Sequence, residues 1–260
     1  MAESTENTMD IAGSNIIVTG GGSGIGKGMC ERFNALGAAN IVVADLNIES
    51  ATAVAESIGG IALECDVADD ASVAKLVDDT IASIGHIDFF FANAGVGVGA
   101  GIEATDQMWD LSMKVNVMGP AIAARHVIPH MEERGQGTFI VTASAAGLNT
   151  GPVSFNYAVS KHAAIGVAEW LAINHGPKIT VQAICPTIVD TPMASDFGNV
   201  MFQALSVDDV VDSIVAGIES GTFIIAPNDQ AINMFQAKAN DYDGFLGNLQ
   251  ERIASMKNAD

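Results

Sequence analysis

Residues 15–36 read NIIVTGGGSGIGKGMCERFNAL, and this stretch decides which fold the chain can adopt. The segment Asn15–Thr19 predicts a short buried strand, and a helical pattern runs from about Ile25 to Leu36. Between them lies a glycine-rich turn. Glycine lets the backbone bend sharply and approach a diphosphate, while the helix N-terminus offers free N–H groups to the anion. Strand, glycine turn and helix in this order favour a dinucleotide-binding unit over a merely flexible loop.

The rest of the chain continues the same alternation of strands and helices. Further strands are predicted at 41–44, 61–65, 87–91, 139–142, 180–184 and 223–226, with helices at 49–57, 73–84, 106–133, 156–174 and 207–219. The tail after residue 229 is predicted to be helical, with breaks at Gly244 and Gly247. We therefore predict an α/β fold, a Rossmann-type doubly wound parallel sheet of about seven strands with helices on both faces. It forms one domain over residues 1–260, with residues 1–12 flexible and 192–205 as a substrate loop.

Several polar or small residues follow the predicted strands, where ligands bind in such sheets. Asp45 ends the second strand, where a carboxylate can accept hydrogen bonds from both ribose hydroxyls of NAD and repel the extra phosphate of NADP. The alternative is a loop or helix-cap aspartate. Asp66 could bond an adenine amino group or cap the next helix, although Asp69 is also available as a cap. The run Ala92, Asn93, Ala94 and Gly95 would let the backbone approach a ligand closely.

A second informative stretch covers residues 139–161, which read FIVTASAAGLNTGPVSFNYAVSK. Tyr157 and Lys161 share one face of a predicted helix, and Ser144 ends the strand before it. A lysine beside a tyrosine favours the phenolate, so we expect the pKa of Tyr157 to lie below the usual value of about 10. Such a tyrosine suits general acid/base chemistry near neutral pH, with Ser144 bonding the same reacting oxygen.

Composition excludes several classes of protein. The net charge is −20, from 31 acidic and 11 basic residues, which argues against nucleic-acid and anionic-membrane partners. The three cysteines, Cys30, Cys65 and Cys185, form no C-x-x-C pair and are predicted to be buried small hydrophobes, without a disulfide or a zinc site. We also predict no metal at His126 and His130. The polar N-terminus and the lack of a long apolar run indicate a cytoplasmic location.

These motifs together resemble the short-chain dehydrogenase/reductase family, in its single-domain branch. The matching residues are Thr19, Gly20, Gly24, Ile25, Gly26, Asp66, Asn93, Ala94, Gly95, Asn116, Ser144, Tyr157, Lys161, Pro186 and Thr191. The resemblance implies that Tyr157 is the acid/base, that Lys161 holds the nicotinamide ribose, and that Ser144 orients the substrate oxygen. It further implies that Asn116 holds a water in a proton relay. Two residues depart from the family pattern, Ala92 for a second asparagine and Thr187 for a glycine.

Seventeen residues are predicted to contact the cofactor. They are Gly20, Ser23, Gly24, Ile25, Gly26, Asp45, Leu46, Asp66, Val67, Asn93, Ala94, Gly95, Tyr157, Lys161, Pro186, Ile188 and Thr191. The backbone around Ile188 and the hydroxyl of Thr191 would meet the carboxamide. Because of Asp45 the cofactor is expected to be NAD in preference to NADP.

The resulting hypothesis is an NAD-dependent oxidoreductase that interconverts a secondary alcohol and its ketone. The alternatives are an imine or enoyl reductase, or a non-catalytic NAD-binding sensor on the same fold. Predicted pocket walls at 96–100, 145–148, 153–155 and 193–205 carry no Lys or Arg, which favours a neutral and largely apolar substrate such as an alicyclic, steroid-like or aryl carbinol. The resemblance also implies a homodimer or homotetramer that pairs through the helices at 106–133 and 156–174.

Overall fold

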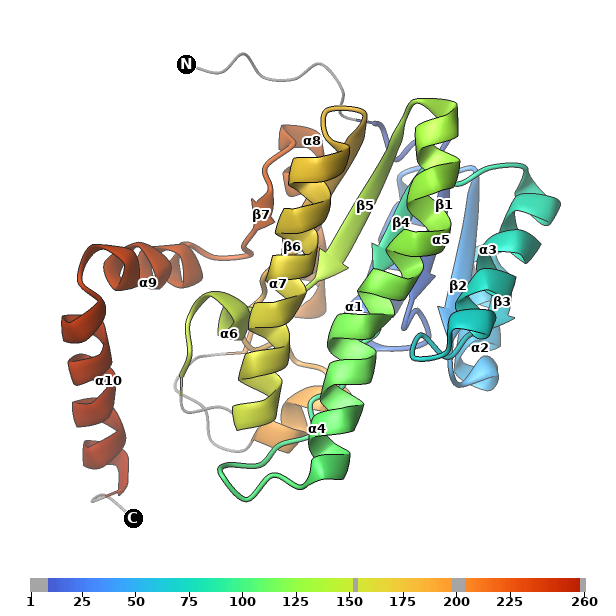
Figure 1. The fold of residues 1–260 in the computed structure, drawn as a ribbon. Coiled ribbons are helices and arrows are strands. Elements are labelled where there is room, and N and C mark those ends of the chain that lie inside the picture. Colours follow the sequence, from blue (N-terminus) through green and yellow to red (C-terminus); the bar gives the residue numbers. More distant parts are fainter. Residues whose placement is uncertain (1–8, 152–153, 198–203, 258–260) are drawn as a thin grey trace.

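Seven parallel strands form one central sheet in the order β3-β2-β1-β4-β5-β6-β7 (Figure 1). The computed structural model describes residues 9–151, 154–197 and 204–257. The strands are β1 (Asn15–Thr19), β2 (Asn40–Asp45), β3 (Ile61–Glu64), β4 (Phe89–Ala92), β5 (Gly137–Thr142), β6 (Ile179–Ile184) and β7 (Ile224–Ile225). Strand order reverses between β1 and β4, and this is the point at which doubly wound sheets bind ligands. The predicted fold class is confirmed.

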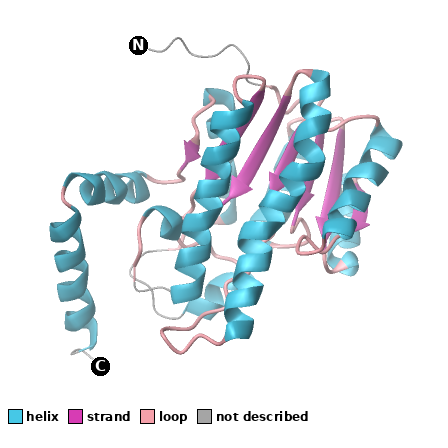
Figure 2. Ribbon diagram, viewed as in Figure 1, coloured by secondary structure: helices cyan, strands magenta, loops and turns pink. Residues whose placement is uncertain are grey.

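Helices cover both faces of the sheet (Figure 2). They are α1 (Gly24–Ala35), α2 (Ile48–Ile58), α3 (Asp70–Ile84), α4 (Asp106–Met113), α5 (Gly119–Arg134), α6 (Ala145–Leu148), α7 (Phe155–His175), α8 (Val207–Ser220), α9 (Asp229–Asn240) and α10 (Tyr242–Lys257). Successive strand residues alternate between two cores. Phe90 lies in the core under α3, α5 and α7, while Phe89 and Phe91 lie in the core under α1, α2 and α8. Burial on both faces explains the nearly continuous apolar strands.

The predicted helix at 106–133 is interrupted where its sequence weakens it. A π-helical segment, η1 (Lys114–Met118), separates α4 from α5. Pro120 lies two residues after this segment and has no N–H with which to continue an α-helical ladder to the carbonyl of Asn116. The distortion expected from Gly119 and Pro120 therefore occurs just before them, and Asn116 lies in this π-helical segment.

The C-terminal helices differ from their prediction. The break between α9 and α10 falls at Asp241, while Gly244 and Gly247 lie inside α10. The Asp241 carboxylate accepts the Gly244 N–H at 2.9 Å, so it begins a new helix there. Figure 1 shows both helices beyond β7, and α9 contacts α6.

Two predicted segments reach past the described residues. In the first, residues 1–8 lie outside them, whereas Ile11 is buried and its carbonyl accepts the Ser14 hydroxyl at 2.6 Å. In the second, the 3₁₀-helix η2 (Pro192–Phe197) begins the predicted substrate loop, and 198–203 are not described. Within the described ranges, no helix has the length and apolar character that a bilayer crossing requires.

Candidate active site

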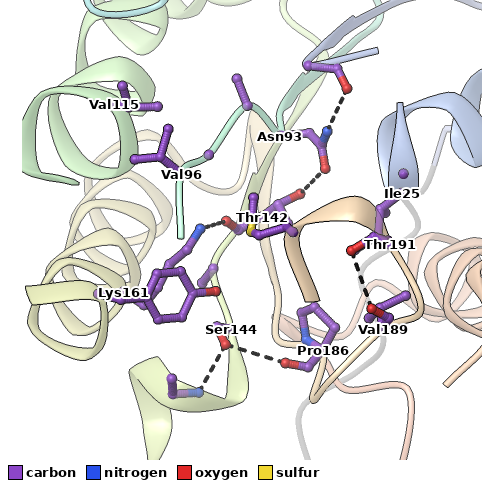
Figure 3. Close-up of a pocket in the computed structure, with 18 of the residues that line it drawn as sticks. Ile25, Asn93, Val96, Val115, Thr142, Ser144, Lys161, Pro186, Val189 and Thr191 are labelled. Atoms are coloured by element: carbon purple, nitrogen blue, oxygen red, sulfur yellow. Dashed lines mark hydrogen bonds between the residues drawn. The ribbon is translucent and has the colours of Figure 1, made fainter. Parts of the chain in front are cut away.

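A cavity of about 750 Å³ opens at the carboxyl edge of the sheet. Every residue predicted for the site lines it except Asn116: Gly20, Ser23, Gly24, Ile25, Gly26, Asp45, Leu46, Asp66, Val67, Asn93, Ala94, Gly95, Ser144, Tyr157, Lys161, Pro186, Ile188 and Thr191. Most of these residues follow the ends of β1, β2, β3, β4, β5 and β6, which a parallel sheet brings to one edge, while Tyr157 and Lys161 come from α7. Figure 3 shows part of this lining.

The glycine turn leaves the N-terminus of α1 open to the cavity. Ser23 is the N-cap residue, but its side chain accepts no bond from the first turn, and the first turn holds no acidic residue. In α2 and α3, by contrast, Asn47 and Asp69 accept an N–H of the first turn. At Gly26, a Cβ would lie 2.1 Å from the Gly20 carbonyl oxygen, so only glycine allows the tight turn. Uncapped N–H groups that face a cavity fit a diphosphate.

Asp45 accepts hydrogen bonds from the glycine turn and from the Asn47 backbone, and it does not cap α2. Its Oδ2 accepts the Gly22 N–H at 3.0 Å, and its Oδ1 accepts the Asn47 N–H at 3.0 Å. The cap of α2 is Asn47, which accepts the Ser50 N–H at 2.9 Å. Each oxygen of a carboxylate can accept a second bond, so Asp45 can still meet two hydroxyls in the cavity. Leu46 beside it is 66% exposed.

Asp66 does not cap α3. Asp69 caps α3 by accepting the Ser72 N–H at 2.7 Å. Asp66 accepts the Ala68 N–H at 2.9 Å in a turn, and it lines the cavity together with Val67. A helix-cap role therefore does not account for Asp66, and contact with a bound ligand remains open to it.

Asn93 links the ends of three strands. Its Nδ2 donates to the Thr19 carbonyl at 2.9 Å. Its Oδ1 accepts the Thr142 hydroxyl at 3.0 Å (Figure 3). Gly95 follows where the backbone approaches other groups closely. A Cβ at Gly95 would lie 3.3 Å from Asn116 Oδ1 and 3.4 Å from Lys161 Nζ. The small residues of this turn thus give room to side chains from η1 and α7.

Ser144 and Lys161 approach the cavity from two sides of the β5 end (Figure 3). Ser144 caps α6 by accepting the Ala146 N–H at 3.1 Å, and its hydroxyl lies 3.5 Å from the Pro186 carbonyl oxygen. Lys161 is 3% exposed, and its Nζ donates to the Thr142 carbonyl at 2.8 Å. The same Nζ lies 5.7 Å from the centre of the Tyr157 ring.

Burial shifts the pKa values of both Tyr157 and Lys161 in the chain without a ligand. Burial raises the pKa of Tyr157, and the hydrogen bond from Ser144 opposes that rise. Burial also lowers the pKa of Lys161 from 10.5 to about 8. The predicted fall in the tyrosine pKa is therefore wrong for the chain without a ligand, because desolvation of the buried phenol is the largest cause of the shift and raises the pKa. Nearby Cys185 has its pKa raised to about 12 by burial, so it stays a neutral thiol.

Asn116 lies behind the cavity wall. Its Oδ1 accepts the Val96 N–H at 2.9 Å, and its Nδ2 donates to the Val96 carbonyl at 3.0 Å and to Ser160 Oγ at 2.9 Å. The side-chain amide thus holds the loop after β4 against α7. Asn116 does not line the cavity, so its predicted contact with a relay water stays a prediction.

The structure adds lining residues that sequence reasoning did not select. They include Leu111, Lys114 and Val115 from α4 and η1, Asn149 after α6, Gln230, Ala231 and Met234 from α9, and Leu249 from α10. Of the predicted pocket walls, Val96, Ala145, Ala146, Met193 and Ala194 line the cavity, while residues 153 and 198–203 lie outside the described chain. The cavity lining contains the basic residue Lys114, whereas the four predicted pocket walls contain no Lys or Arg.

His126 and His130 contact different partners. His126 Nε2 lies 3.2 Å from Asp70 Oδ1, whereas His130 Nε2 accepts the Ile87 N–H at 3.2 Å. Among the described residues, no three His, Cys, Asp or Glu side chains gather in a way that could hold a metal ion.

A doubly wound parallel sheet with an uncapped glycine turn at its switch point defines a dinucleotide-binding protein. The family model described as short chain dehydrogenase matches residues 14–200, and the chain belongs to this family. It is therefore an oxidoreductase of a family that binds a nicotinamide cofactor.

Known relatives and structures agree with this assignment. A 2,5-dichloro-2,5-cyclohexadiene-1,4-diol dehydrogenase of Sphingobium indicum is 40% identical over 191 residues, which cover 71% of this chain and 76% of the relative. The mitochondrial (-)-isopiperitenol/(-)-carveol dehydrogenase of Mentha piperita is 35% identical, with 72% and 74% covered. A short-chain dehydrogenase/reductase from Burkholderia phymatum in complex with NAD has a TM-score of 0.82 at 25% identity, with 90% and 96% covered.

Proposed function

We propose that the protein is an NAD-dependent oxidoreductase that interconverts a secondary alcohol and its ketone, with Tyr157 as general acid/base. The observation that carries the proposal is the meeting of Ser144, Tyr157 and Lys161 in the cavity that the glycine turn also lines. A non-catalytic sensor would need the glycine turn and Asp45 without these three side chains.

The nicotinamide, when bound, supplies hydride exchange with the carbinol carbon. The protein then has to hold the substrate oxygen and move its proton. Ser144 donates a hydrogen bond to that oxygen, and the Tyr157 phenol gives it a proton during ketone reduction or takes one during alcohol oxidation. A raised tyrosine pKa keeps the phenol protonated at neutral pH, which suits reduction. Oxidation needs the phenolate, so it is expected to accelerate as the pH rises.

The preference for NAD rests on Asp45. Its carboxylate bonds the Gly22 N–H and so stands beside the turn that would hold the diphosphate. A negative charge at this position accepts ribose hydroxyls and repels a 2′-phosphate. The uncapped N-terminus of α1 would bind the diphosphate, and Lys161 with Thr191 would hold the nicotinamide end.

The substrate is proposed to be a neutral secondary alcohol on a ring. The two relatives named above are dehydrogenases of a cyclohexadienediol and of carveol, both cyclic alcohols. On the substrate side the cavity is lined by apolar groups that include Met193, Met234 and Leu249. The charged side chains of the lining are Asp45, Asp66, Lys114 and Lys161, and none comes from α6, α9 or α10.

We also propose that two copies pair through α7. Its outer face carries exposed apolar side chains, with Phe155 49%, Val159 40%, Trp170 60% and Ile173 80% exposed. Burying such a face against a second copy removes apolar area from water. Sedimentation of the wild type and of Trp170→Lys decides this, since the variant should sediment as a smaller species. A wild-type monomer would contradict the pairing.

The test of the proposed activity uses the two tyrosines of the chain. With a panel of cyclic secondary alcohols and NAD, the wild type should form NADH, and Tyr157→Phe should lose about 10²- to 10⁴-fold in kcat. The matched control is Tyr242→Phe on α10, where the side chain is 56% exposed, and it should keep wild-type turnover. Near-normal turnover by Tyr157→Phe would contradict the assigned role.

A further inference from the structure

The amino edge of the sheet, opposite the cavity, holds a buried carboxylate among basic side chains. Asp88 lies directly before β4 and is 4% exposed. Its Oδ1 accepts a bond from Arg134 Nη2 at 2.8 Å, and its Oδ2 accepts the Asn15 N–H at 2.9 Å. His86 Nε2 lies 3.2 Å from the same Oδ2. In Figure 1 this edge is the one away from the arrowheads of the strands. The cluster joins the starts of β1 and β4 to the end of α5.

His130, one turn before the end of α5, adds a bond that only its neutral form can make. Its Nε2 accepts the N–H of Ile87 at 3.2 Å, and Ile87 is fully buried. Within the described part of the chain, this N–H has no other acceptor. Accepting the bond requires a ring nitrogen without a proton, so the neutral imidazole carries its proton on Nδ1. A protonated ring would set one donor against another, and the buried N–H would lose its partner.

The groups around His130 oppose its protonation. Burial lowers the pKa of His130 below 6.5, and the positive charges of Arg134 and His86 lower it further, while Glu133 and Asp88 act in the opposite sense. Arg134 is close because its Nη1 donates to the Ile87 carbonyl at 2.7 Å. Asp88 is already paired with this guanidinium, and Glu133 is exposed to solvent. Neither carboxylate therefore offers a protonated His130 a buried counter-ion.

The elements packed against α5 offer no free counter-ion either. On the α3 side, Asp70 lies 3.2 Å from His126 Nε2. On the α7 side, His175 Nδ1 lies 2.9 Å from Glu132, which belongs to α5 itself. The strand β5 (Gly137–Thr142) carries no charged side chain. The bond to Ile87 is thus the interaction that protonation of His130 removes, and no ion pair among these groups replaces it.

We propose that His130 is a pH-sensitive latch between α5 and the residues that lead into β4, holding the Ile87 N–H when neutral and releasing it when protonated. Because the pKa of His130 in the folded chain lies below 6.5, the unfolded chain takes up the proton first as the pH falls. The stability that the latch contributes is therefore present above about pH 6.5 and is lost as the pH falls through the folded-state value. The latch is independent of the proposed function, since none of its residues lines the cavity.

The direct test is hydrogen exchange of the Ile87 amide, followed by NMR and corrected for the intrinsic exchange rate at each pH. The reference is the amide of Phe90 within β4, which is fully buried. Between pH 7.5 and pH 5, protection of Ile87 in the wild type should fall relative to Phe90 by about 2- to 12-fold, the range for one neutral hydrogen bond. His130→Gln keeps an amide acceptor that does not titrate, so it should show no such fall.

The matched control is His126→Gln, one helical turn earlier, which removes a histidine bonded to Asp70 and should retain the wild-type fall. Titration of the wild-type His130 ring by NMR gives a second readout, and its midpoint should lie below 6.5. A midpoint at or above 6.5, or a wild-type ratio of Ile87 to Phe90 protection that does not change with pH, would overturn the proposal whether or not the variants fold. A fall that persists in His130→Gln would overturn it as well.

Discussion

The buried ammonium of Lys161 leads to a stability prediction that needs no substrate. Lys161 is 3% exposed, and burial lowers its pKa from 10.5 to about 8. A lysine that is harder to protonate when folded makes the unfolded chain bind more protons, so stability must rise with pH between these two values. We expect Lys161→Met to remove that dependence.

The magnitude follows from the two pKa values. A lowering from 10.5 to about 8 corresponds to about 3 kcal/mol of destabilisation near pH 7, where the lysine is protonated in both states. At pH 9.5 the folded lysine is largely neutral, and only about 1 kcal/mol of this cost remains. The variant also loses the bond from Nζ to the Thr142 carbonyl, at a cost of about 1–3 kcal/mol, and any difference between the charged and neutral forms of this bond is already contained in the folded-state pKa. The difference between wild type and variant should therefore change by about 2 kcal/mol between pH 7 and 9.5, in favour of the wild type at high pH.

Urea unfolding at one protomer concentration measures this difference. The matched control is Lys75→Met on α3, because the side chain of Lys75 is 74% exposed in an i,i+4 pair with Asp79. Its difference from the wild type should stay within about 0.5 kcal/mol at both pH values. If the Lys161→Met difference is the same at pH 7 and pH 9.5, Lys161 is not a desolvated ammonium and its pKa is not lowered in the folded chain.

Three further predictions concern the cofactor site and the scaffold. Asp45→Asn should raise kcat/KM for NADP relative to NAD by at least about 10-fold, since the repelling charge is gone; an unchanged ratio in parallel assays would contradict the role of Asp45. Gly26→Ala places a methyl group 2.1 Å from a backbone carbonyl oxygen of the glycine turn, so calorimetry should show NAD affinity reduced at least about 10-fold, whereas Gly166→Ala, which meets nothing within 4 Å, should bind normally. Asn156→Leu strands buried polar partners, including the Ser112 hydroxyl at 2.8 Å, and should lower the free energy of urea unfolding by about 3 kcal/mol; a loss below about 1 kcal/mol would show that the site relaxes.

The parts of the site that the sequence could predict are those set by local spacing. The strand, glycine turn and α1 are adjacent in the chain, and Tyr157 and Lys161 are four residues apart on one helix. Parallel strands bring the strand ends to one edge of the sheet, so the pattern of strand ends was enough to predict the cofactor side of the cavity.

What could not be predicted depends on contacts between distant segments. The part of the lining that comes from α9 and α10 depends on which face of a C-terminal helix contacts α6, and the sequence does not give this. The bond between Asn149 and Ala231 is one such contact between distant segments. The direction of the Tyr157 pKa depends on burial depth, and spacing along a helix carries no information about it. The helix break at Asp241 likewise reflects a side-chain cap that prevailed over two glycines of low helix propensity.

The central claim is that the protein exchanges a hydride with a carbinol carbon whose oxygen is held by Ser144 and Tyr157. The most direct measurement is a reaction of the wild type with NAD and a cyclic secondary alcohol deuterated at the carbinol carbon, followed by mass spectrometry of both products. We expect one deuterium in the reduced nicotinamide for each ketone formed, and formation of this product about 10²- to 10⁴-fold more slowly with Tyr157→Phe. Ketone formed with the deuterium lost to water, or an equal rate with the variant, would contradict this claim.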